Sequence, residues 1–104
     1  MDEKFEKYNE ATTFLKLLAN PNRLAILCHL QHKAFNVTEL TLALGMPQAA
    51  LSNQLAILRE SGLIDCDIKH RERIYYIKDA KVIETIQLLH RFFCDEKAKS
   101  SKAA

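Results

Sequence analysis

Tryptophan is absent from the sequence, and glycine and proline are rare, with two of each among 104 residues. Because glycine and proline are the residues that most often interrupt helices, their scarcity favours a mostly helical chain with short turns. Long apolar runs are also missing, since none approaches the roughly 20 residues that a membrane-spanning helix needs. The sequence therefore predicts a helical protein with no membrane partner.

Charge of one sign is in little excess, with 15 Lys and Arg against 13 Asp and Glu and a net charge of +2. So small an excess does not establish nucleic-acid binding, and the placement of charge matters more than its sum. The opening residues MDEKFEKYNE are charged and amphipathic, unlike a secretory signal. We therefore expect a cytoplasmic protein with reduced cysteines, and the odd number of three argues against a complete disulfide framework.

Hydrophobic spacing predicts two helices in the first third of the chain. An apolar stripe indicates a first helix over residues 5–19. Asn20 and Pro21 form a cap and a first helical position, so a second helix is predicted over residues 21–33. That helix is apolar over much of its circumference, and we expect it to be central. The stripe of the first helix comprises Phe5, Tyr8, Thr12, Leu15 and Leu18.

A short helix, a three-residue turn and a longer helix follow. Asn36 and Glu39 have the spacing of a capping box at the start of VTELTLAL. Gly45 suits a left-handed helix exit, and Pro47 suits the first turn of the next helix. The inner face of that fourth helix is expected to comprise Leu51, Leu55 and Leu58, widened by Ala56 and Ile57.

Gly62 ends the fourth helix, and two extended runs, LIDCDI and RIYYI, then predict a hairpin with the charged tip KHRE. Asp79 is the expected cap of a last helix over residues 80–94. The apolar stripe of the last helix comprises Val82, Ile83, Ile86, Leu89, His90 and Phe93.

The order of four helices, two strands and a helix predicts a mainly α, winged helix-turn-helix fold. We expect one domain over residues 1–97, followed by a disordered tail over residues 98–104. A nucleophile–base constellation, a phosphate loop and a CxxC motif are all missing from the sequence, which argues against an enzyme. Nothing in the sequence calls for a cofactor.

Polar residues open the fourth helix, where side chains of a helix in the major groove reach base edges. Amides pair with adenine, hydroxyls are adaptable, and an alanine methyl contacts the thymine methyl. The basic hairpin tip can contact phosphates or the minor groove, although nearby acidic residues dilute its charge. Each feature alone is typical of a solvated surface, but their order favours DNA binding. The predicted DNA contacts are Gln48, Ala49, Ser52, Asn53, Gln54, Lys69, His70, Arg71 and Arg73.

Three segments, LKLLANPNRLAIL, VTELTLALGMPQAALSNQLAILRESGLI and RIYYI, resemble the ArsR/SmtB family of winged-helix repressors over residues 14–94. The resemblance implies a homodimer built from the first and last helices, whose two recognition helices read an imperfect palindrome in double-stranded operator DNA. The chain departs from the common pattern at Pro47 and Ala49, where many members have serines, and its wing lacks the usual glycine at the tip.

The segments ILCHL and LLHRFFC resemble the persulfide- and redox-sensing subgroup of the family. By this resemblance, Cys28 and Cys94 form a disulfide or polysulfide with reactive sulfur species, and the repressor then releases its operator. Taken alone, each cysteine is more typical of a small apolar core residue than of a sensor. Cys66 lies outside the pair and is expected to be structural or incidental, and His90 is expected to be a packing residue.

Two alternatives stay open at this point. A metal-responsive repressor is conceivable with Cys28, His90 and Cys94 as zinc ligands, although we expect no metal site. The ligand sets of metal-sensing members are not present. VTELTLAL has no cysteine, and in the last helix Lys81 stands at the next ligand position expected after Asp79, with only His90 available later. The other alternative is a DNA-binding antirepressor without an effector.

Overall fold

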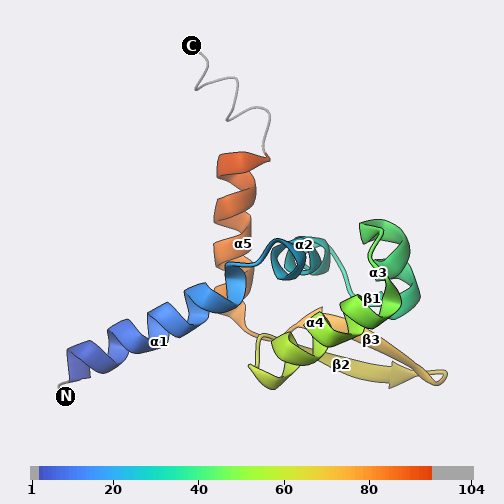
Figure 1. The fold of residues 1–104 in the computed structure, drawn as a ribbon, viewed down its shortest axis with the longest axis horizontal. Helices are drawn as coiled ribbons and strands as arrows, with labels where there is room; N and C mark the ends of the chain where they lie inside the picture. Colours follow the sequence, from blue (N-terminus) through green and yellow to red (C-terminus); the bar gives the residue numbers. More distant parts are fainter. Residues whose placement is uncertain (1–2, 95–104) are drawn as a thin grey trace, which may run out of the picture.

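The computed structural model describes residues 3–94 and forms a helical body with a β-hairpin wing (Figure 1). The elements are α1 (Glu3–Leu18), α2 (Pro21–Leu30), β1 (Phe35–Asn36), α3 (Val37–Leu44), α4 (Gln48–Glu60), β2 (Ile64–Lys69), β3 (Glu72–Ile77) and α5 (Ala80–Phe93). The predicted winged helix-turn-helix order is confirmed. In the part of the chain that the structure describes, no helix is both long and apolar enough to cross a bilayer. The expected tail at residues 98–104 lies outside the described residues.

The structure differs from the sequence prediction between α2 and α3. The second helix ends at Leu30 rather than at residue 33. The chain then forms β1, which pairs with β3 so that Phe35 lies opposite Tyr75 and completes a three-stranded antiparallel sheet in the order β1-β3-β2. A strand of two residues has no alternation to recognise, and tertiary pairing alone defines it.

Side-chain caps begin three of the helices, as their sequences predict. Asn20 accepts from the N–H groups of Asn22 and Arg23 at the start of α2. Asn36 and Glu39 form the complete capping box of α3, and Asp79 accepts from the N–H of Lys81 at the start of α5. Each such cap stabilises its helix by about 1 kcal/mol. Gly45 ends α3 with φ at 67°, the left-handed conformation that glycine adopts without steric cost.

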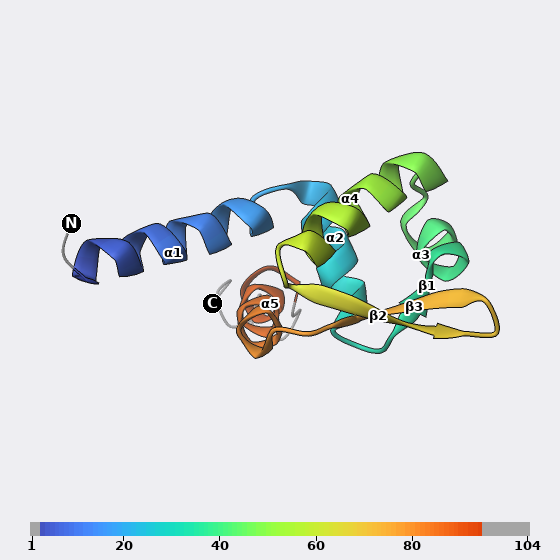
Figure 2. The ribbon, with the colours of Figure 1, turned by 90° about the horizontal axis from the view of Figure 1, so that it is seen from below.

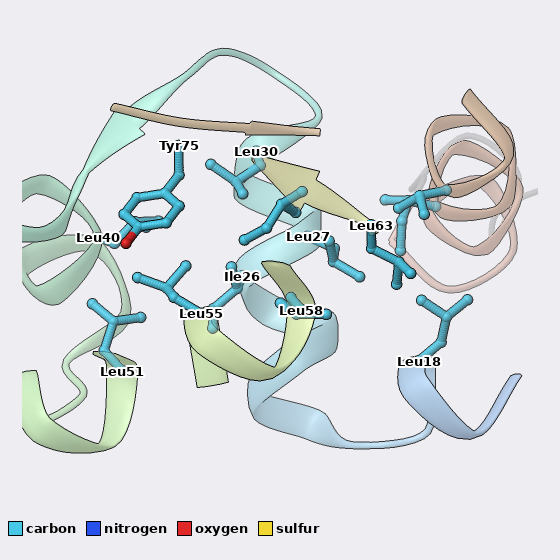
Figure 3. Close-up of a cluster of buried hydrophobic side chains, with 13 residues drawn as sticks. Leu18, Ile26, Leu27, Leu30, Leu40, Leu51, Leu55, Leu58, Leu63 and Tyr75 are labelled. Carbon is cyan, nitrogen blue, oxygen red and sulfur yellow. The ribbon is translucent and has the colours of Figure 1, made fainter. Parts of the chain in front are cut away.

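The core lies around α2, which runs between α4 and the sheet (Figure 3). Ile26 and Leu27 of α2 are fully buried. From α4, the predicted residues Leu51, Leu55 and Leu58 are buried against them. The prediction for Ala56 is wrong, since its side chain is exposed. Ala56 lies on the side of α4 that faces the wing, where a cleft separates the two elements.

Helix α1 projects from this body as an arm, on the side opposite the tip of the wing (Figures 1 and 2). The radius of gyration is 15.5 Å, whereas a compact domain of this length has about 13 Å. Of the predicted stripe only Leu18 is buried, while Tyr8 and Leu15 are 64% and 59% exposed. In a single chain, the stripe of α1 therefore has little to pack against.

The hairpin pairs β2 with β3 in antiparallel register, with Cys66 opposite Tyr75 and Lys69 opposite Glu72. Two residues, His70 and Arg71, make the turn. Both have positive φ, at 52° and 69°, as a tight two-residue turn of this kind requires. Such turns usually contain glycine or asparagine, so the tip holds two larger side chains in a strained conformation.

We expect Ile26→Ala to lower the free energy of unfolding by about 2–5 kcal/mol, because it opens a cavity in the fully buried centre of the core. Urea denaturation followed by circular dichroism measures this loss. Leu42→Ala on α3 is the matched control. Its side chain is 80% exposed, so its effect is expected to stay within about 0.5 kcal/mol. Equal losses for the two variants would contradict the assignment of the core.

Candidate nucleic-acid interface and cysteine site

The first two turns of α4 present a polar surface to solvent. The exposed residues are Gln48, Ala49, Ser52 and Asn53. They point to solvent because the buried leucines of α4 lie on the other side of the helix and pack into the core. A groove-reading helix needs this arrangement, with small and polar side chains outward and an apolar face that fixes its position. The structure therefore places these four predicted residues together on one accessible surface.

The N-terminus of α4 is left without a side-chain cap. Pro47 occupies the cap position and makes no side-chain hydrogen bond to the first turn, in contrast to the asparagine and aspartate caps of α2, α3 and α5. The first N–H groups of a helix have no partner within the helix and carry partial positive charge. An anion such as a DNA phosphate is suited to that position.

Gln54 differs from the other predicted contacts because its side chain is engaged within the protein. It is half-buried, and its Oε1 accepts a hydrogen bond of 3.2 Å from Nη1 of Arg23. Paired recognition of adenine by an amide needs both its oxygen and its nitrogen. In this conformation Arg23 occupies one of the two lone pairs of the Gln54 oxygen, and the bond fixes the orientation of the amide.

Arg23 is the residue of this region to which the sequence analysis gave no role. Its Nε donates to the carbonyl of Leu17 at 2.7 Å, and its Nη2 donates to the carbonyl of Lys16 at 3.2 Å. Together with the bond to Gln54, these contacts join the end of α1 to α4. The sequence feature that could have indicated this role is a single arginine near the start of a largely apolar helix.

The wing carries the second group of predicted DNA contacts. Lys69, His70, Arg71 and Arg73 are all exposed. A cleft of about 470 Å³ separates the wing from α4 and is lined by Ser52, Ala56, Arg59, Glu60, Arg73 and Tyr75. Ser52 and Arg73 are thus predicted contacts from different elements that face the same space.

An ion pair fixes the base of the wing to the end of α4. Arg59 Nε donates to Oδ1 of Asp65 at 3.1 Å. The N–H of Cys66, and then Arg59, hold the pKa of Asp65 below its usual value by stabilising the carboxylate. Both partners are accessible to solvent, so the pair serves orientation more than stability.

Cys28 and Cys94 line the same cavity. Its volume is about 160 Å³, and its other lining residues are Leu24, Leu89, His90 and Phe93. Cys28 comes from the middle of α2 and is half-buried, whereas Cys94 caps the end of α5 and is exposed. Both cysteines are free thiols. Packing of α5 on α2 therefore brings together the two thiols that the sequence resemblance paired.

The two thiols differ in their environment. Burial, and then the charge of nearby Cys94, raise the pKa of the Cys28 thiol. Since the thiolate is the reactive form, Cys28 is the less reactive thiol at neutral pH. Exposure makes Cys94 the one that a dissolved reagent meets first.

The histidines near the cysteines have separate roles. His90 lines the cavity and meets the His32 ring edge-to-face at 6.3 Å between centroids. His29 is instead directed to the carbonyl of Ala25, at 2.9 Å from its Nδ1. Within residues 3–94, no group of three or more His, Cys, Asp and Glu side chains is placed to hold a metal ion. The geometry thus gives no support to zinc ligation by Cys28, His90 and Cys94.

Comparison with known proteins finds the same fold and similar sequences. The model for bacterial regulatory proteins of the arsR family matches residues 20–65. The chain is 33% identical over 95 residues to the biofilm growth-associated repressor of Xylella fastidiosa, covering 91% of this chain and 83% of that protein. Reduced HlyU from Vibrio cholerae superposes with a TM-score of 0.86 at 36% identity, covering 91% of this chain and 100% of the other.

A third similar structure is described as a homodimeric winged helix-turn-helix DNA-binding domain, from Mb0332 of Mycobacterium bovis. Its TM-score is 0.75 at 27% identity, and the match covers 86% of this chain and 83% of that one.

Alkylation should distinguish the two thiols. With iodoacetamide near neutral pH, we expect Cys94 to be modified before Cys28, because Cys28 is half-buried and has a raised pKa. Peptide mass spectrometry over time measures both rates. In Cys94→Ser the alkylation of Cys28 should shift to lower pH, since one cause of its raised pKa is removed. Faster modification of Cys28 in the unaltered protein would contradict the geometry.

Proposed function

This chain belongs to the ArsR family of bacterial regulatory proteins, and we propose that it is a dimeric repressor that releases operator DNA when reactive sulfur species bridge Cys28 and Cys94. As a member of that family it is a winged helix-turn-helix transcriptional regulator. The observation that carries the proposal is the cavity that both cysteines line, between two helices that also contact the rest of the DNA-binding unit.

DNA recognition is assigned to α4 and the wing. The exposed side chains of Gln48, Ala49, Ser52 and Asn53 are available to base edges in the major groove. The basic tip of the wing, with Arg73 beside it, is available to phosphates or to the minor groove. The uncapped start of α4 supports a further phosphate contact.

Dimerisation is assigned to α1 and α5. Both helices expose large apolar side chains, namely Phe5, Tyr8, Leu15, Leu88, Phe92 and Phe93. Large apolar side chains exposed along a helix are typical of protein interfaces. A groove of about 390 Å³ between α1 and the start of α5 offers further space for a partner chain. The homodimeric state of the similar Mb0332 domain supports a dimer.

The proposed switch begins at the exposed thiol. The Cys94 thiolate attacks the outer sulfur of a hydropersulfide, R–S–SH, and expels R–S⁻, which leaves Cys94 as a persulfide. The Cys28 thiolate then attacks the sulfur of Cys94 and expels HS⁻, which closes a disulfide. If a second sulfur is transferred first, attack on the middle sulfur of Cys94–S–S–SH closes a trisulfide and again expels HS⁻. Alternatively, a peroxide would oxidise the Cys94 thiolate to a sulfenic acid and itself be reduced, and attack by Cys28 would then close the same disulfide with loss of water.

The bridge would act on DNA binding through α5 and α2. It fastens the end of α5 to the middle of α2, which itself packs against α4. The start of α5 is tied to the exit of α4, since the N–H groups of Lys78 and Asp79 donate to the carbonyl of Leu63 at 3.0 and 3.3 Å. Movement of α5 would therefore change the spacing or angle of the two recognition helices. A loss of about 1–3 kcal/mol in fit would greatly reduce operator occupancy.

Two variants should distinguish residues that read bases from residues that contact phosphates. The reference duplex is one that the unaltered protein selects from a randomised library. Asn53→Ala is expected to weaken binding to this duplex by about 1–3 kcal/mol and to relax the base preference of the protein. Lys69→Ala should weaken binding to all duplexes alike. It should also lower the slope of log affinity against log salt concentration by about one, because one phosphate contact is lost. Fluorescence anisotropy with the selected and a scrambled duplex measures both. Unchanged discrimination in Asn53→Ala would remove α4 from the proposed reading surface.

The sulfur response should require both cysteines of the pair. Reduced Cys28→Ser and Cys94→Ser are expected to bind the selected duplex normally but to keep it after treatment with a persulfide donor. Cys66→Ser is the matched control and should still release the duplex. Intact mass and peptide mapping should show a Cys28–Cys94 bridge only in proteins that retain both thiols. Release by either single variant refutes the switch, and no release by the unaltered protein favours the effector-independent alternative.

A further inference from the structure

The hydrogen bonds of Arg23 exceed what the end of α1 requires. The last carbonyls of a helix lack partners within the helix, and a nearby cation interacts favourably with them. Bonds to the carbonyls of Lys16 and Leu17 already meet that need. The third bond, to Gln54, instead crosses to α4, 31 positions away in the sequence. Figure 2 shows the end of α1 and the start of α2 on the side of the molecule where α4 lies.

The chemistry of arginine determines how the Gln54 amide is oriented. A guanidinium has five N–H donors and no acceptor, so Gln54 must turn its carbonyl oxygen toward Arg23. The amide nitrogen then points away from Arg23. While this bond holds, the Gln54 amide is fixed in one orientation, with its N–H donors available to an acceptor on a base.

Arg23 also limits how α4 can move relative to α1. The planar guanidinium holds its donors in a fixed fork, so the two α1 carbonyls on one side determine where the third donor points. Displacement of α4 would break the bond to Gln54 and leave the half-buried Gln54 oxygen without this partner, while Arg23 keeps its bonds to α1.

We propose that Arg23 is a positioning residue for DNA recognition, which holds α4 to the end of α1 and fixes Gln54 with its N–H donors free for DNA. This inference rests on the proposed DNA-binding function and deepens it. It connects the helix assigned to the dimer interface directly to the helix assigned to DNA reading, by a route separate from the cysteine bridge.

A double-mutant cycle tests the proposal on the reduced full chain. Arg23→Met and Gln54→Met each remove one partner of the bond; methionine matches glutamine in length and retains the apolar stem of arginine. Affinity is measured for the duplex that the unaltered protein selects from a randomised library, and for a scrambled duplex of the same composition. We expect each single variant to lose about tenfold in affinity for the selected duplex, equivalent to about 1.4 kcal/mol, with little change for the scrambled one. The double variant should also lose about tenfold.

Independent effects would instead multiply to about a hundredfold loss, which would overturn the proposal. So would losses of equal size on both duplexes, since a merely structural role weakens all binding alike. Arg59→Met is the matched control, because Arg59 lies on α4 but pairs with Asp65. In the double variant of Arg59 and Gln54, the fold-losses in affinity caused by Arg59→Met and Gln54→Met should multiply.

If Arg23→Met fails to fold, Arg23→Lys takes its place in the cycle, because one ammonium can retain a carbonyl of α1 while losing Gln54. A protein that folds but selects no duplex contradicts the proposed function itself. If the protein selects a duplex but the losses of the two single variants multiply in the double variant, only the proposed role of Arg23 is contradicted.

Discussion

The burial of α2 against α4, the sheet and α5 is the constraint on which the rest of the structure depends. Ile26 and Leu27 are completely removed from solvent, and their neighbours come from elements that have different tasks. Helix α4 is buried on one side and presents polar side chains to solvent on the other, and α5 approaches α2 so that Cys94 and Cys28 line one cavity. Because interiors are packed to high density, a displacement of α2 is transmitted rather than absorbed.

Most of the fold could be predicted from local signals in the sequence. The capping box at Asn36 and Glu39, the glycine at position 45 and the leucine spacing of α4 each specify a boundary or a buried face within a few residues. Periodicity could not place β1, because its two residues are defined only by pairing with β3. The apolar stripe of α1 was recognised, but its exposure in the single chain was not, since periodicity identifies an apolar face and not what covers it.

The candidate site was predictable to a lesser degree, because it depends on contacts between distant parts of the chain. The polar surface of α4 and the basic wing tip follow from local sequence, and the structure places their residues as expected. The pairing of Cys28 with Cys94 came from resemblance alone, and the shared cavity now gives it a geometric basis. The engagement of Gln54 by Arg23 was invisible, since nothing in the sequence indicates which of several amides will face an arginine of another helix.

The turn at the tip of the wing has a consequence for how this protein could be improved or degraded by mutation. His70 and Arg71 occupy the left-handed region, which costs an ordinary side chain about 1 kcal/mol or more. A chain selected for folding alone would place Asn-Gly at these two positions. The side chains of His70 and Arg71 are therefore held at the tip at a cost in stability. Under the proposed contact of the wing with DNA, substitutions here that raise thermal stability would be expected to lower affinity for DNA.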